Sequence, residues 1–242
     1  SLLDLCWSEK AAISLLATST LGLIVESTSN HDAIFDSQHD AVAKFLQMTT
    51  SKDEQIQEVT LKTLAVLSTG GPHHKHKLLQ ADFSSGRCLE RAFNSCPANS
   101  QILCNAACVI ANLATSETDQ MAMHELMSAV SRKLPGSEGH TELMCHLTRA
   151  LANFAQFKPN VFHLLDAIPT VMRHVLSSGP APARDQALRF LLHLLAHAPE
   201  QVSALIAVND AQTFLTSLGE TRSLMENIGH SLAQSAPAVM KP

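Results

Sequence analysis

Histidine and cysteine are the residue types in this chain with the clearest capacity for chemistry, because both can bind metal ions. The chain of 242 residues contains 13 histidines and 6 cysteines. His73, His74 and His76 form a run that could bind zinc through neutral imidazoles. The run directly follows a Gly-Gly-Pro break, however, and has no spaced cysteines or carboxylates beside it. We interpret it as the solvated start of a helix and expect no metal site.

The six cysteines are interpreted as reduced thiols that serve packing. They are Cys6, Cys88, Cys96, Cys104, Cys108 and Cys145. A chain of this length with 45% hydrophobic residues can build a core without disulfides, and free cysteine is among the most buried residue types. Cys104 and Cys108 share one helical face, but packed helices lie about 8–10 Å apart, too far for a disulfide without rearrangement. Reduced thiols indicate a cytoplasmic location, with the nucleus or the cytoskeleton as alternatives.

Catalytic motifs are absent from the sequence. It contains neither a serine in a G-x-S-x-G setting nor a phosphate-binding glycine loop. The nine glycines mostly separate apolar segments. We therefore expect no enzymatic activity and no cofactor.

The charge balance argues against nucleic acid as a partner. The net charge is −5 with neutral histidines, and the 17 Lys and Arg residues form no basic tract that could neutralise phosphates. The longest apolar stretch, residues 11–25, is shorter than the roughly 18–20 residues that span a bilayer. It predicts a buried helix and no direct membrane insertion. Because apolar residues begin at Leu2, we expect the sequence to be a piece of a longer protein.

Similar apolar segments recur along the chain at nearly constant spacing. They are 64–68, 110–114, 151–155, 191–196 and, more faintly, 228–233. Their middle residues, at 66, 112, 153, 193 and 230, are 46, 41, 40 and 37 positions apart, and a degenerate copy near residue 22 lies 44 positions before the first. Periods near 40 are typical of helical solenoids. The Leu- and Ala-rich composition, with one Trp and no Tyr, also favours helices over strands.

Each recurring segment ends a long predicted helix, which two shorter apolar segments follow. Gly and Pro breaks at 70–72, 135–136 and 177–180 separate these units. Three helices per unit favour an armadillo repeat over a HEAT repeat, which has two. The sequences Asn-Ala-Ala-Cys-Val-Ile-Ala-Asn-Leu-Ala at 105–114 and His-Leu-Thr-Arg-Ala-Leu-Ala-Asn-Phe-Ala at 146–155 resemble the third helix of an armadillo repeat. An α-solenoid of another family is the alternative.

The resemblance implies an all-α fold, a right-handed α-solenoid of about six armadillo-like repeats in a single domain. The first and last repeats are degenerate. We place the approximate repeats at 1–50, 51–98, 99–137, 138–179, 180–219 and 220–242. The irregular segment 27–39 could form a loop that lies in the groove.

One line along each predicted third helix is mostly polar. Positions four, seven and eleven before each middle residue lie within about 40° of it on a helix of 3.6 residues per turn. The neighbouring positions on both sides are apolar, as at Leu64 and Leu67 or Ile110 and Leu113. Each helix is thus expected to be buried on its flanks, so that the polar lines of stacked repeats join into one groove.

The resemblance also implies a role for two asparagines in this line. In armadillo proteins the third helices line the concave groove, and an asparagine at the middle position binds the backbone of an extended peptide. Asn112 and Asn153 match that asparagine, and a carboxamide can both donate and accept hydrogen bonds. Nuclear-import receptors carry tryptophan four residues earlier, where this chain has Cys108 and Arg149. The chain is therefore not expected to be a typical nuclear-import receptor.

Cations recur at one position of the polar line. Lys62, Arg149 and Arg189 each stand four residues before a middle residue. Arginine forks suit carboxylates and phosphates. We therefore expect a non-enzymatic protein–protein interaction scaffold whose concave groove binds an extended acidic or phosphorylated segment of another protein.

The expected groove residues are Lys62, Asn105, Asn112, His146, Arg149, Asn153, Gln186, Arg189 and His193. Two other functions remain open from the sequence. A regulatory domain could sense a nucleotide or another phosphate ligand in the same groove. A structural component of a cytoskeletal or motor assembly would instead use the convex face.

Overall fold

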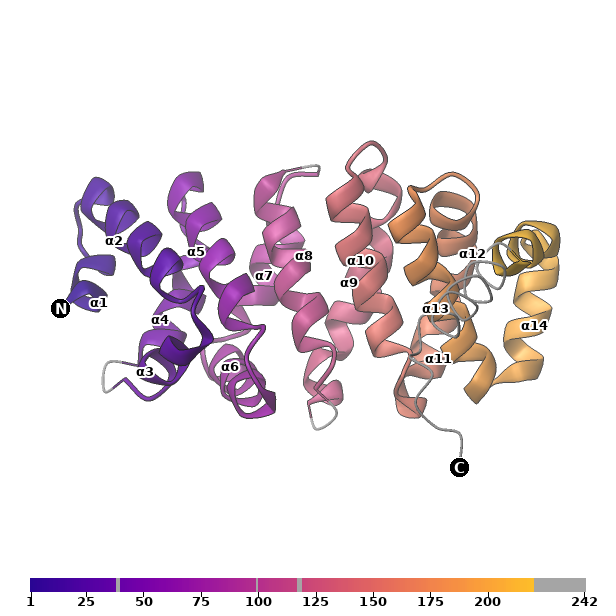
Figure 1. The fold of residues 1–242 in the computed structure, drawn as a ribbon, viewed down its shortest axis with the longest axis horizontal. Helices are drawn as coiled ribbons and strands as arrows, with labels where there is room; N and C mark the ends of the chain where they lie inside the picture. Colours follow the sequence, from indigo (N-terminus) through magenta and orange to yellow (C-terminus); the bar gives the residue numbers. More distant parts are fainter. Residues whose placement is uncertain (38–39, 99, 117–118, 220–242) are drawn as a thin grey trace, which may run out of the picture.

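The chain is built from stacked helices. The computed structural model describes residues 1–37, 40–98, 100–116 and 119–219, and every regular element in these ranges is helical. The helices form an elongated solenoid (Figure 1). The predicted all-α solenoid is confirmed, while the faint last copy at 220–242 lies outside the described residues.

Five long helices contain the recurring segments and are called the third helices below. They are α2 (Ala11–Ile24), α5 (Glu54–Leu67), α8 (Gln101–Leu113), α10 (Thr141–Phe154) and α13 (Ala181–His197). The other α-helices are α1 (Leu2–Cys6), α3 (His31–Phe35), α4 (Ala41–Met48), α6 (Pro72–Ser84), α7 (Cys88–Ser95), α9 (His124–Lys133), α11 (Val161–Leu164), α12 (Ile168–Val171) and α14 (Pro199–Val208). A π-helical turn, Met172–Leu176, continues α12, and residues 211–219 are also helical.

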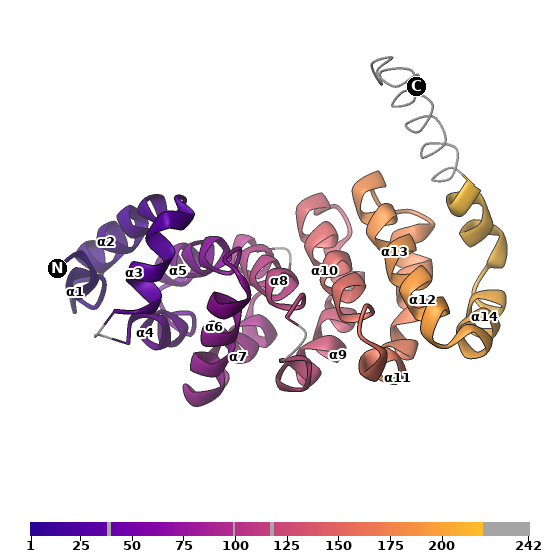
Figure 2. The same ribbon diagram turned by 60° about the horizontal axis from the view of Figure 1, so that its bottom comes forward.

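Consecutive third helices pack side by side, α2 on α5, α5 on α8, α8 on α10 and α10 on α13. The turned view in Figure 2 shows them along one side of the stack, with α6, α7, α9 and α11 on the other side. The predicted apolar flanks are buried, because Leu64, Leu67, Ile110 and Leu113 have no exposed surface. The polar lines of neighbouring third helices therefore lie next to one another on one face.

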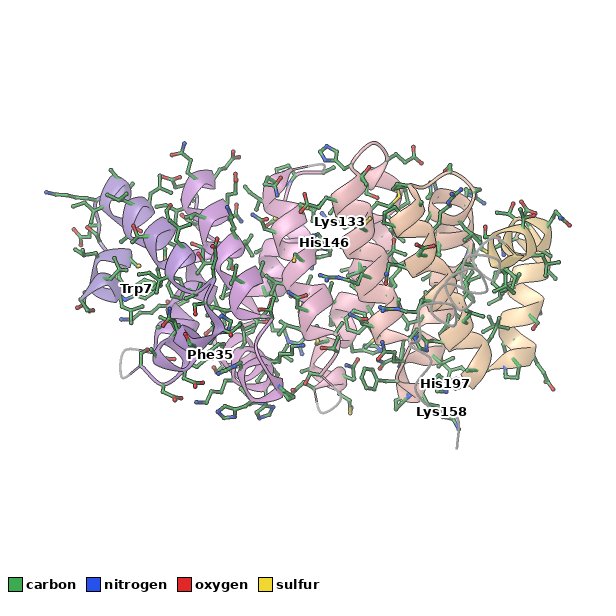
Figure 3. The ribbon with its side chains drawn as sticks, in the orientation of Figure 1. Trp7, Phe35, Lys133, His146, Lys158 and His197 are labelled. Carbon is green, nitrogen blue, oxygen red and sulfur yellow. The ribbon has the colours of Figure 1, made fainter. Side chains whose placement is uncertain are left out.

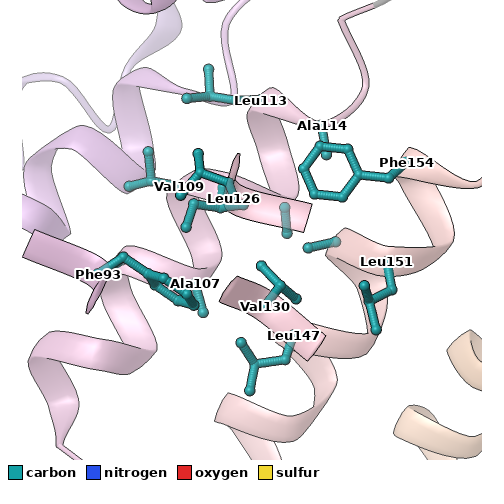
Figure 4. Packing of buried hydrophobic residues seen from close by; sticks show 14 of the residues in the cluster. Phe93, Ala107, Val109, Leu113, Ala114, Leu126, Val130, Leu147, Leu151 and Phe154 are labelled. Carbon is teal, nitrogen blue, oxygen red and sulfur yellow. The ribbon is translucent and has the colours of Figure 1, made fainter. Parts of the chain in front are cut away.

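The core between the two layers combines small and large apolar side chains. Ala106, Ala107 and Ala111 of α8 are fully buried, and such small side chains allow the helices on both sides to approach closely. Figure 4 shows Phe93 and Phe154 packed among the aliphatic side chains of adjacent helices. This burial of apolar surface contributes roughly 25 cal/mol per Å² and is the main source of stability.

Amide side chains cap the C-terminal ends of three third helices in the same way. Asn30, Gln120 and Asn160 each donate to a backbone carbonyl six residues earlier, at 2.8, 3.1 and 3.0 Å respectively. The accepting carbonyls belong to the last helical residue or to the residue directly after it. Carbonyls at a helix end have no partner within the helix, so these amides satisfy them and direct the chain into the next repeat.

Residues 27–37 form the start of a repeat and not a loop in the groove. Thr28–Asn30 is a 3₁₀ turn that leads into α3. His31 is fully buried, and its Nε2 lies 2.8 Å from the carbonyl oxygen of Val25. No single described helix is long and apolar enough to span a membrane. The pair Ala11–Ile24 and Thr28–Phe35 together has the length and apolar composition of a span, but the two segments are bent by 117° relative to each other.

The histidine run begins a helix, as predicted, since α6 starts at Pro72. His73 is exposed, but His74 is half-buried and stacks on the ring of Phe35. His74 Nε2 also lies 2.6 Å from a carboxylate oxygen of Asp32. Part of the run thus joins α6 to α3, which the sequence did not indicate.

The central core predicts the effect of truncating Phe154. Phe154→Ala removes a side chain with no exposed surface, so the free energy of unfolding should fall by about 3–5 kcal/mol. Phe162→Ala is the matched control, because Phe162 is 70% exposed, and it should change the unfolding free energy little. Urea denaturation followed by circular dichroism measures both. Similar losses in the two variants would contradict the assignment of the core.

Candidate functional site

The nine predicted groove residues stand on four successive third helices. Lys62 of α5 is exposed, and Asn153 of α10 is buried with 5% exposure. The other seven are half-buried: Asn105, Asn112, His146, Arg149, Gln186, Arg189 and His193. Among the described residues, no hydrogen bond or ion pair joins Lys62 to this group, so the assembled part of the site lies on α8, α10 and α13.

Asparagines of the polar line join each third helix to the one before it. Asn112 Nδ2 donates to the carbonyl oxygen of Ala65, at 3.2 Å, and to Ser68 Oγ, at 2.9 Å. Asn153 Nδ2 donates to the carbonyl oxygen of Ala111, at 2.7 Å. Ala65 and Ala111 lie in the last turns of α5 and α8, where carbonyls lack partners within the helix. The amides therefore connect neighbouring repeats at a helix end.

Arginines on the following third helix donate hydrogen bonds to the oxygens of the same asparagine amides. Arg149 Nη2 donates to Asn112 Oδ1 at 3.0 Å. Arg189 Nη2 donates to Asn153 Oδ1 in the same arrangement one repeat later. We call these four residues the Asn–Arg ladder. Its pattern was present in the sequence, because each arginine stands four residues before the middle residue of the next repeat.

The ladder changes what the two asparagines can offer to a partner. The Nδ2 and Oδ1 atoms of Asn112 and Asn153 all take part in hydrogen bonds within the protein. Contact of either amide with a peptide backbone stays a prediction, and it would compete with these bonds. The arginines keep more capacity, since no hydrogen bond among the described residues uses Nη1 of Arg149 or Arg189.

A third cation approaches the ladder from outside the third helices. Lys75 of α6 donates from Nζ to Thr115 Oγ1 at 2.6 Å, just beyond the end of α8. Burial lowers the pKa of Lys75, and the positive charge of Arg149 lowers it further. The sequence analysis missed Lys75, because the search followed the third helices alone. Lys75, Arg149 and Arg189 are called the cation cluster below.

Burial and the positive charge of Arg149 also lower pKa values on α13. Burial first, and then Arg149, lower the pKa of Arg189. The pKa of His193 is lowered by burial and by the charges of Arg189 and His197. No carboxylate among the described residues forms an ion pair with Lys75, Arg149 or Arg189. The charge of the cluster is thus left without a counterion by the part of the protein that the structure describes.

Unused donors accompany that charge. The Nε atoms of Arg149 and Arg189 are buried and have no hydrogen-bond partner among the described residues. An unsatisfied buried donor costs roughly 1–3 kcal/mol, and more when it is charged. Together with the free Nη1 groups, these donors make the cation cluster suited to an anion.

Designed and engineered proteins are among the solved structures with the same fold. A designed armadillo repeat protein is 17% identical over 98% of this chain and 92% of its own, with a TM-score of 0.77. An engineered protein of known crystal structure is 20% identical over 88% of this chain and 51% of its own, with a TM-score of 0.76. A designed armadillo repeat protein in complex with the peptide (KR)4 is 16% identical over 89% of this chain and 97% of its own, with a TM-score of 0.68.

No model of a known protein family matches the sequence. No curated protein matches it either. The similarity to solved structures shows that this chain has the fold of an armadillo-repeat solenoid, as the sequence analysis predicted.

The Asn–Arg ladder predicts that Asn153 stabilises the fold. Asn153→Ala removes the bond to the carbonyl of Ala111 and the acceptor of Arg189, so unfolding free energy should fall by about 1–3 kcal/mol. Gln156→Ala, at an exposed position just after the same helix, should have little effect. Thermal and urea denaturation measure both variants. Unchanged stability in Asn153→Ala would contradict the ladder and leave the amide free for a partner.

Proposed function

We propose that this chain is a non-enzymatic protein-binding scaffold whose third helices line a concave groove for an extended, acidic segment of a partner. The observation that carries the proposal is the cation cluster, which has no counterion among the described residues. The chain as a whole has a net charge of −5, so positive charge at this place is not a general property of its surface.

An acidic ligand would relieve two costs that the free protein carries. Carboxylates beside Arg149 and Arg189 would offset both the burial and the repulsion from Arg149 that lower the pKa of Arg189. They would also accept hydrogen bonds from the Nη1 groups, and charged hydrogen bonds are about twice as strong as neutral ones. The same carboxylates would lie within reach of Lys75 at the end of α8.

The spacing of the helices favours an extended segment. Packed helices lie about 8–10 Å apart. An extended chain advances about 3.3 Å per residue, so roughly three ligand residues correspond to one repeat. A ligand that crosses α8, α10 and α13 would therefore place acidic residues about three positions apart.

Two solved structures support peptide binding by this fold. One is a computationally designed armadillo repeat protein for modular peptide recognition, and another is a designed armadillo repeat protein in complex with (KR)4. The (KR)4 peptide is basic. The cations on the third helices of the present chain favour the opposite charge in its ligand.

Charge reversal of the two arginines tests the proposal. Arg149→Glu/Arg189→Glu should weaken binding of a fluorescein-labelled peptide with Glu at every third position and Ser between at least about a hundredfold, because each charged hydrogen bond contributes roughly 1.5–3 kcal/mol. Fluorescence anisotropy measures the affinity. The proposal is wrong if this double variant binds the peptide as tightly as the unchanged protein.

Two further variants separate the groove from general charge and from misfolding. Arg132→Glu/Arg173→Glu changes the net charge equally at two exposed positions and should leave binding nearly unchanged. Lys75→Gln removes one cation without touching the Asn–Arg ladder and should weaken binding about tenfold. Circular dichroism confirms that each variant is folded.

A nucleotide panel addresses phosphate sensing by the same cations. A phosphate ligand at 100 times its Kd adds about 2.7 kcal/mol of stability, which a thermal shift detects. Stabilisation by nucleotides without binding of the acidic peptide would replace the scaffold with a phosphate-sensing domain.

A further inference from the structure

A compact cluster of a thiol, an imidazole and a carboxylate lies at the N-terminal half of α10. Ligand atoms of Cys104, Glu142 and His146 all lie within 4.8 Å of one another. Cys104 belongs to α8, whereas Glu142 and His146 belong to α10, so the cluster joins two neighbouring third helices. His146 lies where α8 and α10 adjoin (Figure 3).

The spacing of the three residues has a simple origin. Glu142 and His146 are separated by four positions and therefore share one helical face. Their side chains already meet, with His146 Nε2 at 3.6 Å from Glu142 Oε1. Cys104 stands eight positions before Asn112, and the packing of α8 on α10 brings its thiol to the same place.

We propose that Cys104, Glu142 and His146 form a zinc-binding site between α8 and α10. Thiolate, imidazole and carboxylate are the three ligand types that zinc takes in proteins, at about 2.0–2.3 Å. Two ligand atoms on one tetrahedral zinc lie about 3.3–3.8 Å apart, so contraction by about 1 Å closes the site. Glu142 can supply this movement, because its side chain is 71% exposed.

Cys104 and His146 are held in place by the packing around them, which suits them as metal ligands. Cys104 is 5% exposed, and the side chain of His146 is 19% exposed. Three protein ligands leave a fourth position, which solvent can reach from the side of Glu142. Cysteine and histidine ligands also favour zinc over magnesium or calcium, which prefer oxygen ligands.

The proton balance of binding follows from the free state. Burial, together with Glu142, Cys108 and Cys145, raises the pKa of Cys104 to about 12, so Cys104 is a neutral thiol without metal. Zinc replaces this proton, which passes to solvent while the sulfur lone pair forms the bond to the metal. Burial and Arg149 lower the pKa of His146, which keeps the imidazole neutral and ready to bind.

Binding also changes one contact of the Asn–Arg ladder. Arg149 Nη2 lies 3.3 Å from His146 Nδ1, which acts as the acceptor in the metal-free protein. Zinc would take Nε2, the nitrogen that faces Glu142, so the single ring proton must then occupy Nδ1. Arg149 loses this acceptor on metal binding. Its bond to Asn112 is independent of the ring and can persist.

Titration of the reduced protein with cobalt(II), and then with zinc(II), tests the site. One equivalent of cobalt should produce the near-ultraviolet charge-transfer absorption of a thiolate ligand, and one equivalent of zinc should remove it. Cys104→Ser should abolish the absorption. Glu142→Gln, at a position whose side chain is 71% exposed, should weaken zinc affinity at least about tenfold.

Controls distinguish this site from other metal-binding groups. Cys96→Ser removes a buried thiol at the end of α7 and should retain the full cobalt absorption. Binding by His73 and His76 would produce no thiolate absorption, because no cysteine accompanies that run in the sequence. Absence of the absorption at one equivalent, its survival in Cys104→Ser, or an unchanged zinc affinity in Glu142→Gln would each overturn the proposal.

Discussion

The carbonyl groups at the C-terminal ends of the third helices are the constraint on which the remaining structure depends. Every α-helix ends with carbonyls that have no partner inside the helix, and a packed helix end must satisfy them. Here amides do so from two directions. Asn112 reaches Ala65 from the next third helix, and Asn160 reaches Phe154 from the turn that follows α10. Polar contacts at the helix ends thus align repeats that apolar flanks hold together.

This way of satisfying the helix ends brings positive charge onto a face of an acidic protein. Arg149 and Arg189 lie over the preceding helix because their acceptors are the amide oxygens of Asn112 and Asn153. Burial lowers the pKa of Lys75 and of Arg189, and the nearby positive charge of Arg149 lowers both further. The same residues therefore stabilise the stack and create the potential that favours an anion.

The polar line of α10 changes character along its length. Its C-terminal half carries Arg149 and Asn153, which take part in hydrogen bonds between repeats. Its N-terminal half carries Glu142 and His146, which lie close to the thiol of Cys104 on the neighbouring helix α8. The polar contacts of both halves have the same physical reason. Because the apolar flanks leave this line partly open, polar side chains on it can reach a neighbouring repeat without being buried without partners.

The sequence by itself determined the helical class, the repeat near 40 residues and the buried flanks of each third helix, because local periodicity encodes which face is apolar. It also indicated the line on which the cations stand. Only the tertiary structure decided the partners along that line. Asn112 bonds a carbonyl 47 positions earlier, Arg149 an amide 37 positions earlier, and Lys75 arrives from α6. Such contacts depend on the register between packed helices, which no local pattern within one helix specifies.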